Sequence, residues 1–146
     1  MNWKVRTTLI GAATALVATV SVAQAAGPRA DASGSSEQLM FKLEDFKISP
    51  RAAEAKAGSV LIKARNAGTV EHELVVARTK RKPANLPTNK LGDVREGAIN
   101  VIGEISETAP GEAGKTKLKL KPGKYVMFCN VPGHYGLGMN GRLTVK

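Results

Sequence analysis

A cysteine, a histidine and a methionine follow one another at equal intervals near the end of the chain. Four residues separate Cys129 from His134, and four more separate His134 from Met139, just after the apolar run at 125–128. The chain has one cysteine and two histidines, so His72 is the only other imidazole available. Two imidazoles, one thiolate and one thioether are the donor set typical of a copper site for one-electron transfer.

The same donor set disfavours other chemistries. Two imidazoles and a thiolate suit both Cu(I) and Cu(II), so little rearrangement accompanies a change of oxidation state. Zinc also binds cysteine and histidine, but a methionine serves it poorly. A nucleophilic pair of Cys129 and His134 would leave His72 and Met139 without a role, and a strand end lacks the helix dipole that activates many thiols.

Each donor also has a plainer interpretation when it is considered alone. Cys129 would be a buried structural thiol, and His72 an ordinary hydrogen-bonded core histidine. A lone cysteine forms no disulfide within its own chain, and in an exported protein it needs another role. Because both histidines and the cysteine fit one site, metal ligation is the favoured interpretation.

The first 25 residues predict a secretory signal peptide. Lys4 and Arg6 form a basic start, residues 7–22 are apolar or small, and Ala23-Gln24-Ala25 predicts cleavage after Ala25. An uncleaved membrane anchor is the alternative, which the shortness of the run disfavours. We therefore expect a periplasmic protein without stable membrane insertion after cleavage.

The remainder of the chain predicts a leader and one domain. Residues 26–37 are small and polar and indicate a flexible leader, while residues 38–146 form the expected domain. Loss of residues 1–25 lowers the formal net charge from +10 to +8, which favours partners with an acidic surface. Few aromatic residues and dispersed lysines argue against nucleic-acid binding, and we expect a monomer.

Short β-type runs, punctuated by glycine, proline and asparagine, predict an all-β sandwich or barrel of about seven or eight strands. The predicted strands lie near 38–48, 58–66, 70–79, 99–106, 115–121, 123–130 and 140–146. Residues 80–98 show no strand period and predict a long excursion with a short helix around Leu91–Glu96. The segment Ala52–Ala57 is helix-prone or a loop.

Strand alternation places the candidate ligands. His72 shares a face with Leu74 and Val76 and should point to the core, whereas Glu73 should point outward. Cys129 shares a face with Met127 at the end of its strand. A core imidazole that binds metal through one nitrogen must donate from the other, to a backbone carbonyl or to water.

At these residues the chain resembles the cupredoxins, the small blue copper proteins. The likeness covers about residues 38–146 and is strongest from Gly123 to Lys146. The equal spacing of Cys129, His134 and Met139 is similar to that of the rusticyanin, sulfocyanin and auracyanin group. The resemblance implies a Greek-key β-sandwich and one copper ion per chain.

The resemblance also implies an upstream ligand after a glycine-containing turn, which His72 matches. In plastocyanin and azurin an asparagine commonly follows that histidine and braces the two ligand loops by hydrogen bonds. Here Glu73 follows instead, so the residues behind the ligands differ. Asn130, directly after Cys129, is a second candidate for this bracing.

The sequence therefore predicts a periplasmic copper protein that carries single electrons between redox proteins. His134 is the expected exit route, surrounded by an apolar docking patch of Val131, Pro132, Tyr135 and Leu137. Delivery of copper in metal homeostasis is the alternative function. A copper enzyme is not expected, because a second copper centre requires further histidines.

Overall fold

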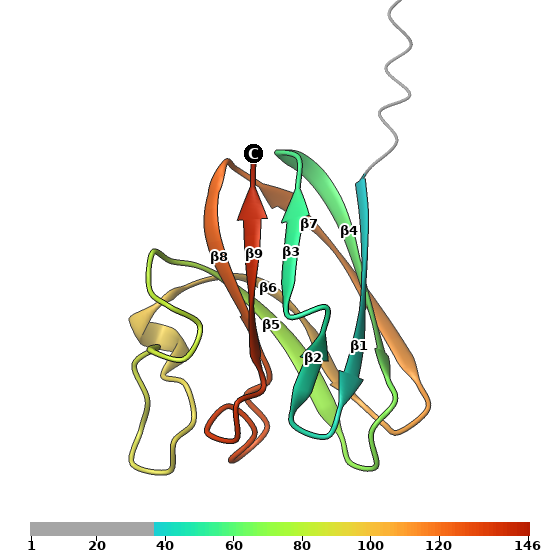
Figure 1. Ribbon diagram of the computed structural model, residues 1–146, viewed down its shortest axis with the longest axis vertical. Helices are drawn as coiled ribbons and strands as arrows, with labels where there is room; N and C mark the ends of the chain where they lie inside the picture. The colour runs from blue at the N-terminus through green and yellow to red at the C-terminus, as the bar shows by residue number, and fades with distance from the viewer. Residues whose placement is uncertain (1–36) are drawn as a thin grey trace, which may run out of the picture. The chain divides into compact units, whose positions relative to one another are not determined.

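The computed structural model describes residues 37–146 (Figure 1). The predicted signal peptide at 1–25 and the leader up to residue 36 lie outside the described residues. Glu37, the expected last residue of the leader, is the first residue of strand β1. Within residues 37–146, no helix has the length and apolar character needed to cross a membrane.

Within residues 37–146, nine strands form two sheets, which confirms the predicted all-β class with slightly more strands than expected. In order across it, the four-stranded sheet contains β2 (Lys47–Ser49), β1 (Glu37–Glu44), β4 (Gly58–Asn66) and β7 (Ala113–Leu120). The five-stranded sheet contains β3 (Ala52–Ala55), β9 (Asn140–Val145), β8 (Gly123–Phe128), β5 (His72–Arg78) and β6 (Asn100–Thr108). The pairs β1–β4 and β3–β9 are parallel, and the other pairs are antiparallel.

The extra strands arise where the sequence pattern was least regular. A turn at Asp45 and Phe46 divides the predicted strand at 38–48 into β1 and β2. The segment at Ala52–Ala55, expected as helix or loop, pairs with β9 because its backbone completes the sheet edge. The helix expected at Leu91–Glu96 does not form, and a short 3₁₀ turn follows at Glu96–Ala98.

The main core lies between the two sheets and is filled by alternate residues of the facing strands. Tyr125, Met127 and Cys129 point into it from β8, as alternation predicted. His72, Leu74 and Val76 are buried on the inner side of β5. Further members are Phe41, Leu43, Ile48, Val60, Ile62, Ile105, Leu118, Leu120, Met139, Leu143 and Val145.

A second apolar cluster lies on the outer face of the five-stranded sheet. Val75 and Ala77 are fully buried there, although alternation alone predicted an outward position. They are covered by residues 79–99, which we call the strap; it joins β5 to β6 and contributes Leu86 and Val94 to the cluster. The strap therefore covers the outer face of β5, so that both faces of this strand lie in apolar surroundings. This explains the unbroken apolar run Leu74–Ala77.

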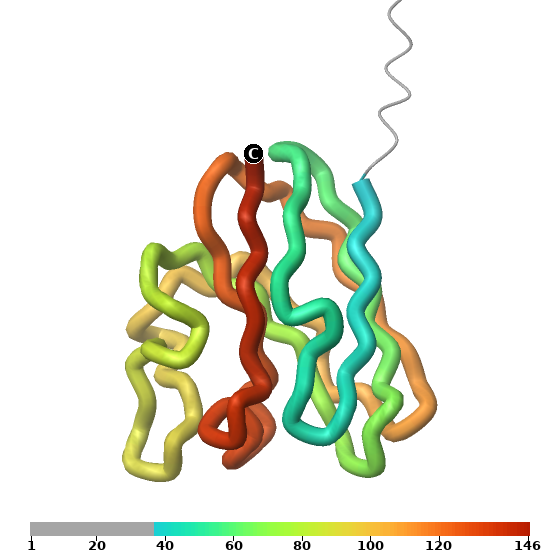
Figure 2. The backbone as a smooth tube through the Cα atoms, in the orientation of Figure 1, coloured from blue at the N-terminus to red at the C-terminus, as the bar shows by residue number. Residues whose placement is uncertain are grey.

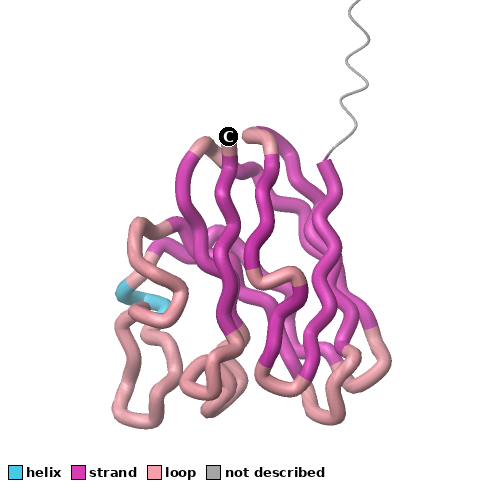
Figure 3. Tube along the Cα trace, in the orientation of Figure 1, coloured by secondary structure: helices cyan, strands magenta, loops and turns pink. Residues whose placement is uncertain are grey.

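The loops that meet at one end of the sandwich are those carrying the candidate ligands. The β8–β9 loop lies beside the β1–β2 turn and the β4–β5 turn, at the end opposite the C-terminus (Figure 2). The strap is mostly loop and flanks the same sheet (Figure 3). The topology thus brings residues near 45, 70 and 134 together from three distant parts of the chain.

Candidate metal centre

The ligand cysteine is fixed by the end of β8. Cys129 follows Phe128, the last residue of the strand, and its side chain is fully buried. Its backbone N–H donates to the carbonyl of Met139 at 3.1 Å, so the two ends of the ligand loop are tied together. The backbone N–H of Glu73 lies 3.5 Å from the sulfur, which makes the Sγ atom an acceptor before any metal is considered.

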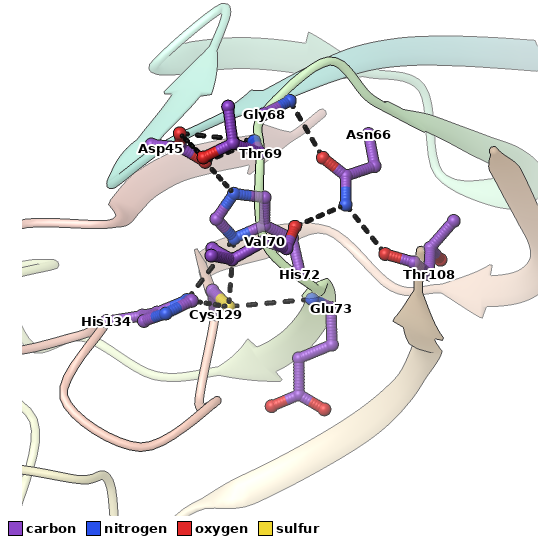
Figure 4. Close-up of polar contacts among 10 residues, drawn as sticks. All are labelled: Asp45, Asn66, Gly68, Thr69, Val70, His72, Glu73, Thr108, Cys129 and His134. Atoms are coloured by element: carbon purple, nitrogen blue, oxygen red, sulfur yellow. Dashed lines mark hydrogen bonds and ion pairs between the residues drawn. The ribbon is translucent and has the colours of Figure 1, made fainter. Parts of the chain in front are cut away.

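The two histidines converge on this sulfur from different elements (Figure 4). His72 begins β5, and His134 lies in the β8–β9 loop. The Nδ1 atom of His134 is 3.4 Å from the sulfur, and that of His72 is 4.0 Å away. The two Nδ1 atoms are 3.2 Å apart, and the three donor atoms all lie within 4.8 Å of one another. Three buried donors at this separation fit a single metal ion.

The ligand loop is compact because consecutive turns close it. The N–H of His134 donates to the carbonyl of Val131 at 2.9 Å, and the N–H of Leu137 donates to that of Gly133 at 3.1 Å. Gly133 and Gly138 have φ angles of 84° and 96°, a region in which side chains are disfavoured. These turns place the imidazole of His134 over the end of the core.

Met139 lies on the opposite arm of the same loop. Its backbone N–H donates to the carbonyl of His134 at 3.1 Å, and its side chain is fully buried in the cluster that contains Cys129. Met139 is the residue for which the sequence predicts ligation through a thioether.

The electrostatics of the cluster favour neutral donors in the absence of metal. Burial raises the pKa of the Cys129 thiol to about 11, and burial also lowers the pKa of His134. A bound cation reverses the first effect, because a coordinating thiol gives up its proton. Imidazole nitrogens and a thiol that ionises on binding fit copper well, and ligation by Cys129 releases the proton of its thiol.

Glu73 bridges the two ligand-bearing segments. In addition to the contact of its N–H with the sulfur of Cys129, its carboxylate accepts the backbone N–H of Asn130 at 2.8 Å. Burial raises the pKa of Glu73 to about 7. Glu73 thus makes the kind of bridge that the resemblance attributes to an asparagine at this position.

Asn130 also braces the loop, but toward the strap. Its side-chain oxygen accepts the N–H of Val94 at 2.7 Å, and its amide donates to the carbonyl of Val94 at 3.0 Å. The amide is also 2.9 Å from the carboxylate of Glu96. Asp93 adds a further link, since it accepts the N–H of Gly133 at 2.8 Å.

Tyr135 does not contribute to an exposed patch, contrary to the prediction. Only 6% of it is exposed, and its ring packs in the second cluster against Phe128. Its hydroxyl donates to the carbonyl of Pro83 at 2.8 Å and accepts the N–H of Leu86 at 2.9 Å. Side chains along a loop do not alternate regularly between two faces, so the sequence did not show which way the Tyr135 ring would point.

The remaining predicted patch residues lie at the surface to different degrees. Leu137 is 61% exposed, Pro132 is exposed and Val131 is half-buried. Two apolar residues missed by sequence reasoning are also exposed, Phe46 at 41% and Val70 at 43%. The Phe46 ring meets that of His134 edge-on, with centroids 5.2 Å apart.

Asp45 was also missed, and it contacts a candidate ligand directly. Its Oδ1 atom lies 3.1 Å from Nε2 of His72. Hydrogen bonds from the hydroxyl and backbone of Thr69 hold the pKa of Asp45 down at about 2. An aspartate in a strand-linking turn has an ordinary role in turn formation, so no sequence signal distinguished it.

Comparison with known proteins agrees with this centre. The model of copper binding proteins of the plastocyanin/azurin family matches residues 29–146. Among curated protein sequences, no significant match is found.

Several solved structures share the fold. One is dithionite-reduced auracyanin from the photosynthetic bacterium Roseiflexus castenholzii, with a TM-score of 0.60 and 20% identity over 77% of this chain and 99% of that one. Auracyanin B has a TM-score of 0.59 and 20% identity over 75% of this chain and 88% of its own. Auracyanin A, a blue copper protein from the green thermophilic bacterium Chloroflexus aurantiacus, has a TM-score of 0.55 and 22% identity over 75% and 99%.

The family match covers most of the chain, and the structure gathers three buried donors suited to copper. This protein therefore belongs to the plastocyanin/azurin family of copper-binding proteins, and its cofactor is copper.

Proposed function

We propose that this chain is an exported carrier of single electrons. The proposed copper ligands are His72, Cys129, His134 and Met139. The observation that carries the proposal is the convergence of the cysteine sulfur and two Nδ1 atoms within 4.8 Å in a buried position. Copper, when bound, supplies the couple between Cu(I) and Cu(II).

The chain's own residues would keep the donors fixed during electron transfer. The backbone N–H of Glu73 contacts the sulfur of Cys129. The backbone hydrogen bond from Cys129 to Met139 fixes the ends of the loop that carries this sulfur. The strap holds the other side of the loop through Asn130 and Asp93. A donor set that does not rearrange keeps the reorganisation cost of an electron transfer small.

His134 supplies the proposed path to a partner. Its Nδ1 atom faces the other donors, and its ring is 8% exposed. The Nε2 atom of His134 makes no hydrogen bond with the described residues. Every buried side-chain nitrogen or oxygen in residues 37–146 has a hydrogen-bond partner, so this Nε2 atom is not buried. The Nε2 edge therefore reaches the surface, and the exposed ring of Phe46 lies against the imidazole.

A basic surface that begins at Asn140, next to the ligand loop, and extends to the opposite end of β8 supports an acidic partner. Three adjoining hollows of about 430, 620 and 330 Å³ lie along β8, β9 and the start of the strap. Their cationic lining residues are Arg51, Arg78, Lys80, Arg81, Lys82, Lys124 and Arg142. We call this set the basic cleft; within residues 37–146 no acidic side chain lines it and none of its members forms an ion pair.

The basic cleft adjoins the proposed ligands through two contacts. Arg51 donates to the side chain of Asn140 at 3.3 Å, and Asn140 follows Met139. Pro83, which lines the cleft, accepts the hydroxyl of Tyr135 in the ligand loop. An acidic protein attracted to the cleft would thus lie near the His134 edge, as steering by complementary charge requires.

The docking proposal is tested by oxidising the Cu(I) protein with hexacyanoferrate(III), a small anion. Lys82→Glu with Arg142→Glu changes the charge inside the cleft, and Lys117→Glu with Lys119→Glu makes the same change on the distant β7. We expect the cleft variant to react more slowly than the β7 variant at low ionic strength, with the difference vanishing at high salt. Equal slowing of both variants would refute a local role for the cleft.

Copper delivery is the alternative function, and the structure gives it less support. A delivery protein must release its ion, whereas Cys129 is fully buried and its loop is held on both sides. Incubation of the Cu(I) protein with a chelator separates the two functions. Release over many minutes agrees with a carrier, and release within seconds would favour delivery.

We infer that the chain is not an enzyme and that it acts in the periplasm. Both histidines of the chain are used in one cluster, which leaves none for a second copper centre. The location rests on the predicted signal peptide. The intact mass of the protein recovered from the periplasm should correspond to a chain beginning at Ala26, and a mass including residues 1–25 would indicate a retained anchor.

A further inference from the structure

The buried histidine ligand has a protein partner on the side that faces away from the other donors. Nδ1 of His72 points to Cys129 and His134, whereas its Nε2 atom lies 3.1 Å from Oδ1 of Asp45 (Figure 4). The imidazole is fully buried, so solvent has no access to either nitrogen. When Nδ1 binds a cation, Nε2 carries the proton and donates to this carboxylate.

The carboxylate is itself held in place. The backbone N–H of Thr69 lies 2.9 and 3.1 Å from its two oxygens, and the hydroxyl of Thr69 donates to Oδ2 at 2.7 Å. Asp45 is in the β1–β2 turn and Thr69 is in the β4–β5 turn, so these bonds join the two loops above His72. A carboxylate with three donors around it keeps one orientation although its side chain is 33% exposed.

Gly68 provides the space for this contact. A side chain at this position would collide with Oδ1 of Asp45, and its Cβ atom would lie 2.7 Å from Nε2 of His72. The N–H of Gly68 donates to the fully buried side chain of Asn66 at 2.8 Å. Asn66 in turn donates to the carbonyls of Val70 and Thr108 at 2.8 and 2.7 Å. The turn is thus anchored so that its glycine lies against the pair.

No other carboxylate in residues 37–146 hydrogen-bonds to a side chain of the three-donor cluster. Glu73 accepts the backbone N–H of Asn130, and Asp93 accepts that of Gly133. These two residues shape the loop, whereas Asp45 acts on an imidazole. A carboxylate on the far nitrogen of a metal-bound histidine fixes its tautomer and raises its basicity.

We propose that Asp45 is a positioning residue that fixes the Nε2–H tautomer of His72 and stabilises Cu(II) relative to Cu(I). The inference rests on the proposed function, since it requires His72 to bind copper. The physical cause is twofold: the carboxylate directs the Nδ1 lone pair toward the metal, and its negative charge favours the more positive oxidation state. Asp45 thereby lowers the reduction potential of this protein.

The first test uses the metal-free, unsubstituted protein. Nitrogen-15 NMR of the His72 ring, recorded where both histidines are neutral, should show the proton on Nε2. A proton on Nδ1 would overturn the proposal without any substitution. This measurement is independent of copper and of electron-transfer activity.

The second test compares Asp45→Asn with Glu44→Gln, which removes the carboxylate of the preceding residue, whose side chain contacts Lys42 and Ser49. We expect Asp45→Asn to weaken Cu(II) binding about tenfold more than Cu(I) binding, which raises the potential by about 59 mV. Glu44→Gln should leave the potential close to that of the unsubstituted protein. Equal potentials in Asp45→Asn and the unsubstituted protein would overturn the inference.

Gly68→Ala gives an independent variant, because its methyl group would press on both Oδ1 of Asp45 and Nε2 of His72 and so separate them, while the charge of Asp45 stays in the protein. We expect a smaller rise in potential than in Asp45→Asn and a change in the His72 ring signals.

The outcomes also separate the two proposals. An unsubstituted copper protein without a thiolate-to-copper band contradicts the proposed function, whereas a blue protein with an unaltered Asp45→Asn potential contradicts only this inference.

Discussion

The two histidines reach the same sulfur from contrasting surroundings. His72 belongs to a sheet, is fully buried and pairs with Asp45 behind its ring. His134 belongs to a loop, and its far nitrogen reaches the surface beside Phe46. Under the proposed function, this difference would let one histidine fix the position of the metal while the other connects it to a partner.

The two sides of the ligand loop differ in a similar way. On the core side, Cys129 and Met139 are held by the sandwich itself. On the outer side, the strap holds Asn130, Gly133 and Tyr135 through hydrogen bonds and a separate apolar cluster. The segment around His134 is therefore held from both sides.

The largest effect should come from removing each imidazole in turn. His72→Gly and His134→Gly should both lose the visible copper–thiolate absorption. External imidazole should restore this absorption in His134→Gly at concentrations at least about tenfold lower than in His72→Gly. The reason is that the space left by the His72 ring is buried and bounded by Asp45 and Gly68, so imidazole enters it poorly. The measurement is the visible absorption during an imidazole titration, and equal restoration would remove the proposed contrast.

A smaller effect should follow from loosening the strap. Tyr135→Phe leaves the buried N–H of Leu86 and the carbonyl of Pro83 without their partner, which should cost about 1–3 kcal/mol of unfolding free energy. The amide protons of Val94 and Gly133 should exchange faster. Denaturant unfolding and hydrogen exchange measure these two effects.

Tyr125→Phe is the matched control for the strap. The hydroxyl of Tyr125 also donates to a carbonyl and accepts an N–H, both from Lys121, at the other end of β8. This substitution should lower the unfolding free energy without faster exchange at Gly133. If Tyr125→Phe and Tyr135→Phe affect the ligand loop equally, the strap has no specific role in holding it.

The smallest effect concerns Phe46, which covers His134 with a φ angle of 63°, a conformation that bulky residues rarely adopt. Phe46→Ala removes the contact between the Phe46 and His134 rings and should lower the unfolding free energy by about 0.5–1.5 kcal/mol. Phe46→Gly should lose less, because glycine adopts this φ angle freely. A larger loss in Phe46→Gly than in Phe46→Ala would show that the backbone is not strained.

The elements with regular patterns were predicted well. Leu118 and Leu120 alternate with lysines in β7, which matches the strand predicted near 115–121 and lies at the edge of its sheet. The convergence of His72, Cys129 and His134 was also predicted, because few residues in the chain can bind copper and alternation gave their faces.

The contacts that depend on loop geometry were not predictable. Asp45 and Gly68 meet only because two turns far apart in sequence lie at one end of the sandwich. Tyr135 points to the strap, whose path has no period that a sequence pattern could show. The burial of Val75 and Ala77 on the outer face of the sheet was missed for the same reason, since the covering segment carries only isolated apolar residues.

The most direct test of the central claim is the visible and EPR spectrum of the copper-loaded protein, recorded together with that of Cys129→Ser. The account predicts one copper per chain, an intense thiolate-to-copper band and the narrow copper hyperfine splitting of a blue site, all lost in Cys129→Ser. A colourless Cu(II) form, or a spectrum that Cys129→Ser leaves unchanged, would contradict it.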